Sequence, residues 1–162
     1  MAEAPRLNLD KVSKELGRLV SFELLHWQLR LEFETIRALA IECMPWYSSI
    51  SLSLLTEREK DAGEISDWDT AAWRLFQFPS SPGHVWPLAS ELLIQINNEW
   101  ETLSASDNAG ATTNAAREFT ENLVRACVTA LKSKEVQGAL RKYQLSADFR
   151  LMARHTCRRP RR

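Results

Sequence analysis

The fold is decided by residues 49–54, Ser49-Ile50-Ser51-Leu52-Ser53-Leu54, in which polar and apolar side chains alternate without a break. A period of two is typical of a β-strand that buries one face. Pro45 lies shortly before this stretch and disfavours helix at Met44, so a turn precedes the strand. The residues before that turn are also compatible with a strand. We therefore predict a β-hairpin made of residues 35–43 and 48–55.

Helical periodicity surrounds this hairpin. Apolar residues recur at intervals of three and four from Leu9, and Asn8 or Asp10 can cap the first turn. We extend this first helix to about residue 33, although residues 22–43 also fit a strand in part. Further apolar stripes predict helices from near Pro87 to Leu103, from Thr113 or Asn114 to Leu131, and over residues 134–143.

The C-terminal region predicts one more strand. Apolar and polar residues alternate from Ala147 to Arg154. The order helix, hairpin, helices, strand predicts an α+β fold, in which a small antiparallel sheet (the hairpin plus the C-terminal strand) packs against three or so helices. A chain of 162 residues has the usual length of one domain. We assign residues 1–157 to that single domain and residues 158–162 to a flexible basic tail.

Composition excludes several classes of protein. Lys and Arg together number 21, as do Asp and Glu, so no net charge steers the chain toward nucleic acid or an anionic membrane. No signal peptide begins at Met1, and no apolar run is long enough to span a membrane. Cys43, Cys127 and Cys157 are odd in number and far apart, which favours reduced thiols. We predict a cytoplasmic protein with no membrane partner.

No motif predicts catalysis, a metal site or a cofactor. His26, His84 and His155 lack metal-binding spacing, and no glycine-rich phosphate loop occurs. The one specific catalytic hypothesis pairs Cys157 with His155, because nearby cations such as Arg154 would lower the thiol pKa. The alternative is the fraying end of a strand. We predict that the chain is not an enzyme, and no small-molecule substrate is evident.

Charge is unevenly distributed along the chain. The segment from residue 57 to 69 is locally acidic, whereas the C-terminus is rich in arginine. The arginines suggest an alternative function as a nucleic-acid-associated or adaptor protein. No recognised nucleic-acid motif accompanies them, so nucleic acid is not the expected partner. The residues of this alternative site are Arg158, Arg159, Arg161 and Arg162.

Two short motifs resemble a known group. The hairpin end Leu55-Thr56-Glu57 is followed, after a variable loop, by Asp67-Trp68-Asp69-Thr70-Ala71-Ala72-Trp73-Arg74. This arrangement resembles the uncharacterised immunity-type proteins found beside bacterial polymorphic or contact-dependent toxins, and the coarse order of elements matches over most of residues 9–157. The chain departs from that group's usual acidic character, because its net charge is zero.

The resemblance implies a non-enzymatic protein that inhibits a cognate toxin by stoichiometric binding. The acidic segment would then meet a basic toxin cleft, and two tryptophans would anchor the interface. The alternative for Trp68 and Trp73 is a structural role at the edge of the sheet. The implied partner-binding residues are Glu57, Glu59, Asp61, Glu64, Asp67, Trp68, Asp69 and Trp73.

Overall fold

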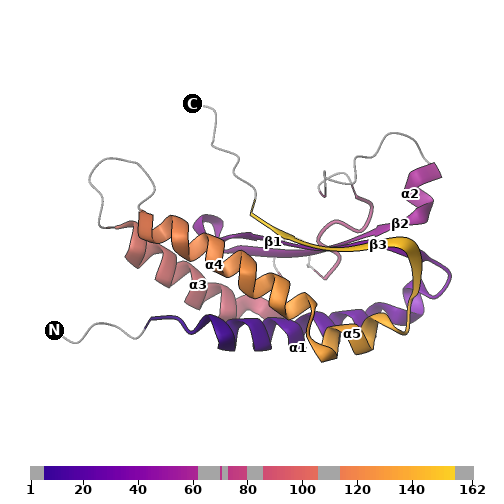
Figure 1. The fold of residues 1–162 in the computed structure, drawn as a ribbon, viewed down its shortest axis with the longest axis horizontal. Helices are drawn as coiled ribbons and strands as arrows, with labels where there is room; N and C mark the ends of the chain where they lie inside the picture. Colours follow the sequence, from indigo (N-terminus) through magenta and orange to yellow (C-terminus); the bar gives the residue numbers. More distant parts are fainter. Residues whose placement is uncertain (1–5, 62–69, 71–72, 80–85, 106–113, 156–162) are drawn as a thin grey trace.

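A three-stranded sheet lies on a layer of helices in the computed structural model, which describes residues 6–61, 70, 73–79, 86–105 and 114–155 (Figure 1). The strand order is β2-β1-β3. The long helices all lie on one side of the sheet (Figure 1). This arrangement confirms the α+β class and the small sheet packed against helices.

The predicted hairpin is confirmed. Strand β1 spans Thr35–Met44, strand β2 spans Ser49–Thr56, and the two pair as antiparallel neighbours. The short 3₁₀ helix η2, Pro45–Tyr47, makes the turn between them. Strand β1 is the centre of the sheet and is buried on both faces, which explains why its sequence is a nearly continuous apolar run rather than an alternating one.

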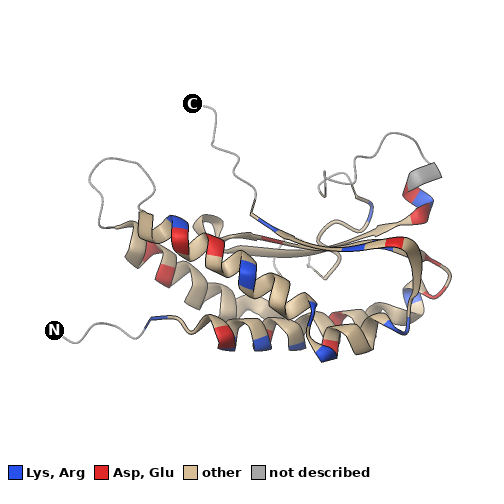
Figure 2. Ribbon diagram, viewed as in Figure 1, with Lys and Arg blue, Asp and Glu red and all other residues tan. Residues whose placement is uncertain are grey.

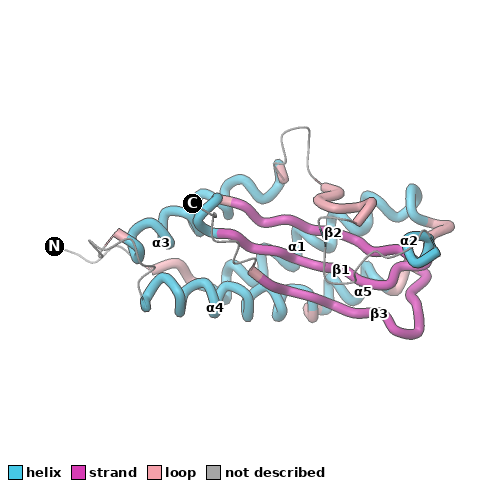
Figure 3. Tube along the Cα trace, turned by 90° about the horizontal axis from the view of Figure 1, so that it is seen from above, coloured by secondary structure: helices cyan, strands magenta, loops and turns pink. Residues whose placement is uncertain are grey.

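Strand β3, Gln144–Arg154, differs from the prediction in its direction. It pairs with β1 as a parallel neighbour, so the sheet is mixed and not wholly antiparallel. Figure 3 shows the three strands side by side, with β1 between β2 and β3. The reason lies in the preceding helices, which bring the chain back to the end of the sheet where β1 begins. Residue Gln144 consequently starts β3 opposite Thr35, the first residue of β1.

The helices agree with the periodicity in the sequence. Helix α1 spans Leu9–Trp27, with the Asn8 side chain accepting hydrogen bonds from two amides of its first turn. The strand alternative for residues 22–33 is wrong, because the chain continues from α1 into a 3₁₀ helix. The remaining helical elements are η1 (Gln28–Leu31), α2 (Glu57–Asp61), η4 (Pro87–Ala89), α3 (Ser90–Ser104), α4 (Asn114–Leu131) and α5 (Lys134–Leu140).

Gly17 allows α1 to approach the junction between α4 and α5. A Cβ atom at this position would lie 3.0 Å from Ser133 Oγ and 3.4 Å from the Ala130 carbonyl oxygen. The glycine therefore lies on the buried side of α1. The close contact fixes α1 beneath the sheet, and the opposite face of α1 is turned to solvent.

The core has a large and a small part. The large part fills the space between the helices and the sheet, with Leu39 and Ile41 of β1 at its centre. The small part lies on the outer face of the sheet, the face away from the helices, where Trp73 packs on Ala38 and Ala40. Core side chains thus cover both faces of the sheet at its centre.

Two of the cysteines lie in the large core as free thiols. Cys43 and Cys127 are both fully buried. A hydrogen bond with Cys43, together with burial, raises the pKa of the Cys127 thiol, which makes it an inert apolar group. Cys157 lies outside the described residues. Among the helices that the structure describes, none is long and apolar enough to cross a membrane.

Candidate functional site

Within the described part of the acidic segment predicted from the sequence, the two glutamates differ in exposure. Glu57 and Glu59 both belong to helix α2, but only Glu57 is exposed. Asp61 ends the same helix, and its side chain lies outside the described part of the structure. The predicted residues Glu64, Asp67, Trp68 and Asp69 also lie outside the described residues.

Glu59 has an internal structural role. One carboxylate oxygen, Oε2, accepts hydrogen bonds from the Thr56 amide at 2.7 Å and from Thr56 Oγ1 at 3.0 Å. The other oxygen, Oε1, accepts from the Arg74 amide at 2.5 Å. The side chain therefore joins the end of β2 to the segment around residue 74. Because Glu59 is only 5% exposed and makes these internal contacts, its carboxylate is not presented to a partner.

Trp73 has a structural role in the sheet, which was the alternative to a role as an interface anchor. Only 2% of it is exposed, and it packs with Leu55 in the small core on the outer face of the sheet. Arg74, its neighbour, donates to Glu34 at 3.1 Å, and Arg58 lies 3.4 Å from the same carboxylate. These contacts make the region a support for the sheet.

Of the other candidate residues, the structure describes only His155. His155 makes an edge contact with Trp46, with 6.2 Å between ring centroids, while Cys157 and the four tail arginines Arg158, Arg159, Arg161 and Arg162 lie outside the described residues. No group of three His, Cys, Asp or Glu side chains within the described ranges could hold a metal ion.

A row of exposed apolar side chains runs from the second half of α1 through η1. Phe22 is 53% exposed, Leu25 45% and Leu29 79%, and Phe33, just beyond η1, is 87% exposed. Monomeric proteins seldom expose several large apolar side chains side by side, and such patches mark interaction sites. The opposite face of the same helix supplies Leu24 to the core. The second half of α1 therefore carries large apolar side chains on its exposed side as well as on its buried side.

The same solvent-facing row is charged in the first half of α1. Lys11, Glu15 and Arg18 precede Phe22 at intervals of four, three and four residues, and Leu25 and Leu29 continue the spacing. Figure 2 shows charged residues along the first half of α1 on the side away from the sheet. We call this row the α1 seam. It is defined by Lys11, Glu15, Arg18, Phe22, Leu25 and Leu29.

Glu15 and Arg18 hold each other within the charged half of the seam. Arg18 Nη2 lies 2.6 Å from Glu15 Oε1, and Arg18 Nε lies 3.1 Å from Oε2, so the guanidinium and the carboxylate form a two-point contact. This hydrogen bonding lowers the pKa of Glu15. Lys11 and Lys14 are exposed beside the pair, which leaves the charged half with an excess of positive charge.

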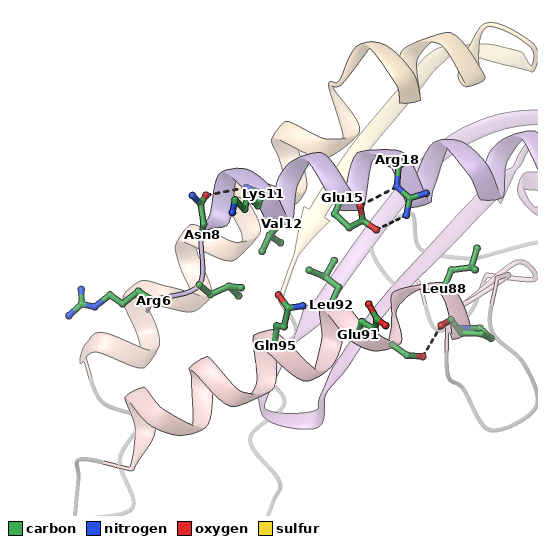
Figure 4. Close-up of a pocket in the computed structure, with 13 residues that line it drawn as sticks. Arg6, Asn8, Lys11, Val12, Glu15, Arg18, Leu88, Glu91, Leu92 and Gln95 are labelled. Atoms are coloured by element: carbon green, nitrogen blue, oxygen red, sulfur yellow. Dashed lines mark hydrogen bonds and ion pairs between the residues drawn. The ribbon is translucent and has the colours of Figure 1, made fainter. Parts of the chain in front are cut away.

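A groove follows α1 on the side of α3. A cavity of about 650 Å³ lies between the first half of α1 and the start of α3, where Glu15, Leu92 and Gln95 lie between the two helices (Figure 4). A second cavity of about 350 Å³ lies beside the apolar half, between Phe22 and Phe78. Both cavities are lined by Pro87 and Leu88, so they meet at η4. We call the two cavities together the α1 groove.

Trp86 and Glu23 fix the wall of this groove. The Trp86 indole is 1% exposed, and its Nε1 donates to Glu23 Oε1 at 2.9 Å. Burial raises the pKa of Glu23, while the indole hydrogen bond and nearby His26 act in the opposite direction. The bond ties η4, which follows Trp86 directly, to the buried side of α1.

Replacing Glu23 with glutamine should remove a pH-dependent loss of stability. Because the pKa of Glu23 is higher in the folded chain than in the unfolded chain, its favourable contribution is complete below the unfolded pKa, about 4.3, and is lost as the pH rises through the folded pKa. Glutamine keeps an oxygen for the indole but carries no charge. In thermal unfolding, we expect the midpoint of Glu23→Gln relative to wild type to be higher at about pH 7 than at about pH 4. An equal difference at both pH values would contradict this.

Comparisons with known proteins return no match to any family model, curated protein or solved structure. The interpretation of the site therefore depends on its geometry. The α1 seam and the α1 groove together offer an exposed apolar surface beside an indented, charged one. Such a surface can bind another macromolecule, because it combines apolar area with a shape that excludes water.

Proposed function

We propose that this chain is a non-enzymatic protein-binding domain that contacts its partner through the α1 seam and the α1 groove. The observation that carries the proposal is the row of exposed apolar side chains formed by Phe22, Leu25, Leu29 and Phe33. Each of them loses unfavourable contact with water when a partner covers it, at about 25 cal/mol for every Å² of apolar surface buried. Burial of this apolar surface can therefore drive binding without any catalysed reaction.

The fold supports a rigid docking surface. Helix α1 is packed against α4 and α5 through the close contact at Gly17, and η4 is tied to it by Trp86 and Glu23. A partner would therefore meet a preformed surface and would not have to order it, which lowers the entropic cost of binding.

Within this class we favour a cytoplasmic immunity-type protein that inhibits a bacterial toxin by stoichiometric binding. The motif resemblance in residues 55–57 and 67–74 supports this choice. Because Glu59 and Trp73 have internal roles, we propose the docking surface on α1 in place of the acidic segment.

The proposal is tested by capturing partners with three forms of the tagged chain. In Leu25→Gln/Leu29→Gln, two exposed apolar side chains of the seam become polar while helix propensity is kept. Ile94→Gln is the matched control, because Ile94 is 60% exposed on α3 and lines neither cavity. We expect the double variant to lose about 100-fold in affinity for the captured protein, whereas wild type and Ile94→Gln bind alike.

The immunity role adds a requirement in cells. The captured protein should be toxic when expressed alone, and co-expressed wild type or Ile94→Gln should rescue growth while the double variant does not. Equal capture by all three forms, with equal thermal stability, would contradict docking through α1. Capture of nucleic acid that salt removes would instead support the alternative based on the arginine-rich tail.

A further inference from the structure

We infer that the α1 surface accepts an amphipathic helix of the partner, with apolar residues over the second half of the seam and acidic residues over the first half. This inference rests on the proposed function and specifies the partner of the same surface. Three observations carry it: the spacing of the seam, the shape of the groove and the distribution of charge.

The spacing of the seam fits a helix. Its three apolar positions, Phe22, Leu25 and Leu29, follow one another at intervals of three and four residues. This is the repeat with which one α-helix packs side chains between those of another. A helix face that stays in water normally carries polar side chains at these positions. The buried face of α1 already supplies the contacts to the core, so exposed apolar residues at this spacing suit a second helix.

The shape of the groove fits the flank of a helix that lies along α1. The two cavities follow α1 from Arg6 to Arg30 and meet at Leu88, which is itself 48% exposed. Side chains from one edge of a docked helix would enter these cavities. A flat bilayer surface would cover the exposed row but would leave the cavities unfilled, so a protruding partner is the better match.

The charges that line the groove indicate which half of the partner helix is acidic. Arg6, Lys11 and Arg18 line the larger cavity, against Glu15 and Glu91. Glu15 and Arg18 pair with each other and cancel in charge. The lining of the larger cavity then has two further positive residues, Arg6 and Lys11, and one further negative residue, Glu91. The smaller cavity is lined mainly by aromatic and apolar groups such as Phe22, Trp27 and Phe78. Acidic residues therefore suit one half of the partner helix and apolar residues the other.

Two synthetic peptides test this inference directly. Each is about three heptads long, with leucine at seam spacing in one half. The other half carries glutamate at that spacing in the first peptide and lysine in the second. Isotope-labelled chain is titrated with each peptide, and amide shifts in the NMR spectrum give both the affinity and the location of binding.

We expect the glutamate peptide to shift amides of residues 9–33 and to bind about tenfold more tightly than the lysine peptide. The variant Lys11→Glu/Arg18→Glu should reverse this preference, and Leu25→Gln/Leu29→Gln should weaken both peptides. Equal affinities, shifts elsewhere in the chain, or no binding at about 1 mM peptide would overturn the inference.

Vesicles of phosphatidylcholine and phosphatidylglycerol test the alternative that a membrane, and not a partner helix, covers the α1 surface. Binding to these vesicles that depends on Leu25 and Leu29 would overturn the helix inference in favour of a membrane surface. Different results would contradict the proposed function and the helix inference. If partner capture depends on the seam but the peptides show no preference, the proposed function stands and the helix inference fails. If capture is indifferent to the seam, the proposed function itself fails.

Discussion

Trp86→Ala should lower the free energy of unfolding by about 4 kcal/mol. The indole is 1% exposed in the large core, so alanine leaves a cavity, and it also removes the donor that contacts Glu23 at 2.9 Å. A natural domain has a total stability of about 5–15 kcal/mol, so the loss is a large part of the whole. Urea unfolding followed by circular dichroism measures it.

Trp86→Phe separates packing from hydrogen bonding at this position. Phenylalanine keeps most of the buried ring but cannot donate to Glu23, so we expect a smaller loss of about 1–2 kcal/mol. If phenylalanine cost as much as alanine, the hydrogen bond would dominate. If neither substitution had a measurable effect, the wall of the α1 groove would not depend on Trp86, contrary to its burial and contact.

Glu59→Ala should lower the free energy of unfolding by about 3 kcal/mol. Its carboxylate accepts from the amides of Thr56 and Arg74 and from the Thr56 hydroxyl, and alanine leaves these donors without that acceptor at a site where Glu59 is only 5% exposed. The same urea measurement detects the change, because a large loss should shift the midpoint without altering the slope.

Glu57→Ala is the matched control for this substitution. Glu57 belongs to the same short helix and to the same acidic run in the sequence, but its side chain is exposed. We expect a change within about 0.5 kcal/mol. Similar small effects at both positions would mean that Glu59 has no structural role and that the acidic segment should be reconsidered as a binding surface.

The hairpin was predictable because its signal is local. Alternation in residues 49–54 and the position of Pro45 depend only on neighbours in the sequence, and the observed strands end within a residue or two of the predicted limits. The direction of β3 was not predictable in this way. Alternation shows that residues 147–154 form a strand, but parallel pairing follows from the path of the helices before Gln144.

The α1 seam has a signal in the sequence that the prediction did not use. Leu24, Trp27 and Leu31 are enough for the buried face of the helix, yet Phe22, Leu25 and Leu29 follow the same 3.6-residue period on the other face. More apolar residues than one core-facing stripe needs indicate a second buried face. The apparent alternation of residues 27–33 concealed this, because Trp27, Leu29, Leu31 and Phe33 also fit a strand.

The internal role of Glu59 could not be predicted from the sequence. Its neighbours Glu57 and Asp61 make it part of an acidic run, and composition alone indicates a solvated surface. What distinguishes it is the segment around Trp73 and Arg74, which lies beside the end of β2 in three dimensions. Trp73 illustrates the same limit: tryptophan is common both in cores and at interfaces, and only its position over Ala38 and Ala40 decides between them.

The central claim is that a partner covers α1, and hydroxyl-radical footprinting of the isolated complex tests it most directly. The method measures how far each side chain is exposed, and Tyr47, which is 61% exposed on η2, serves as an internal control. The account predicts that oxidation of Phe22, Leu29 and Phe33 falls sharply on complex formation while that of Tyr47 is unchanged. Unaltered oxidation of the three α1 side chains, with protection confined to residues 57–73, would contradict it.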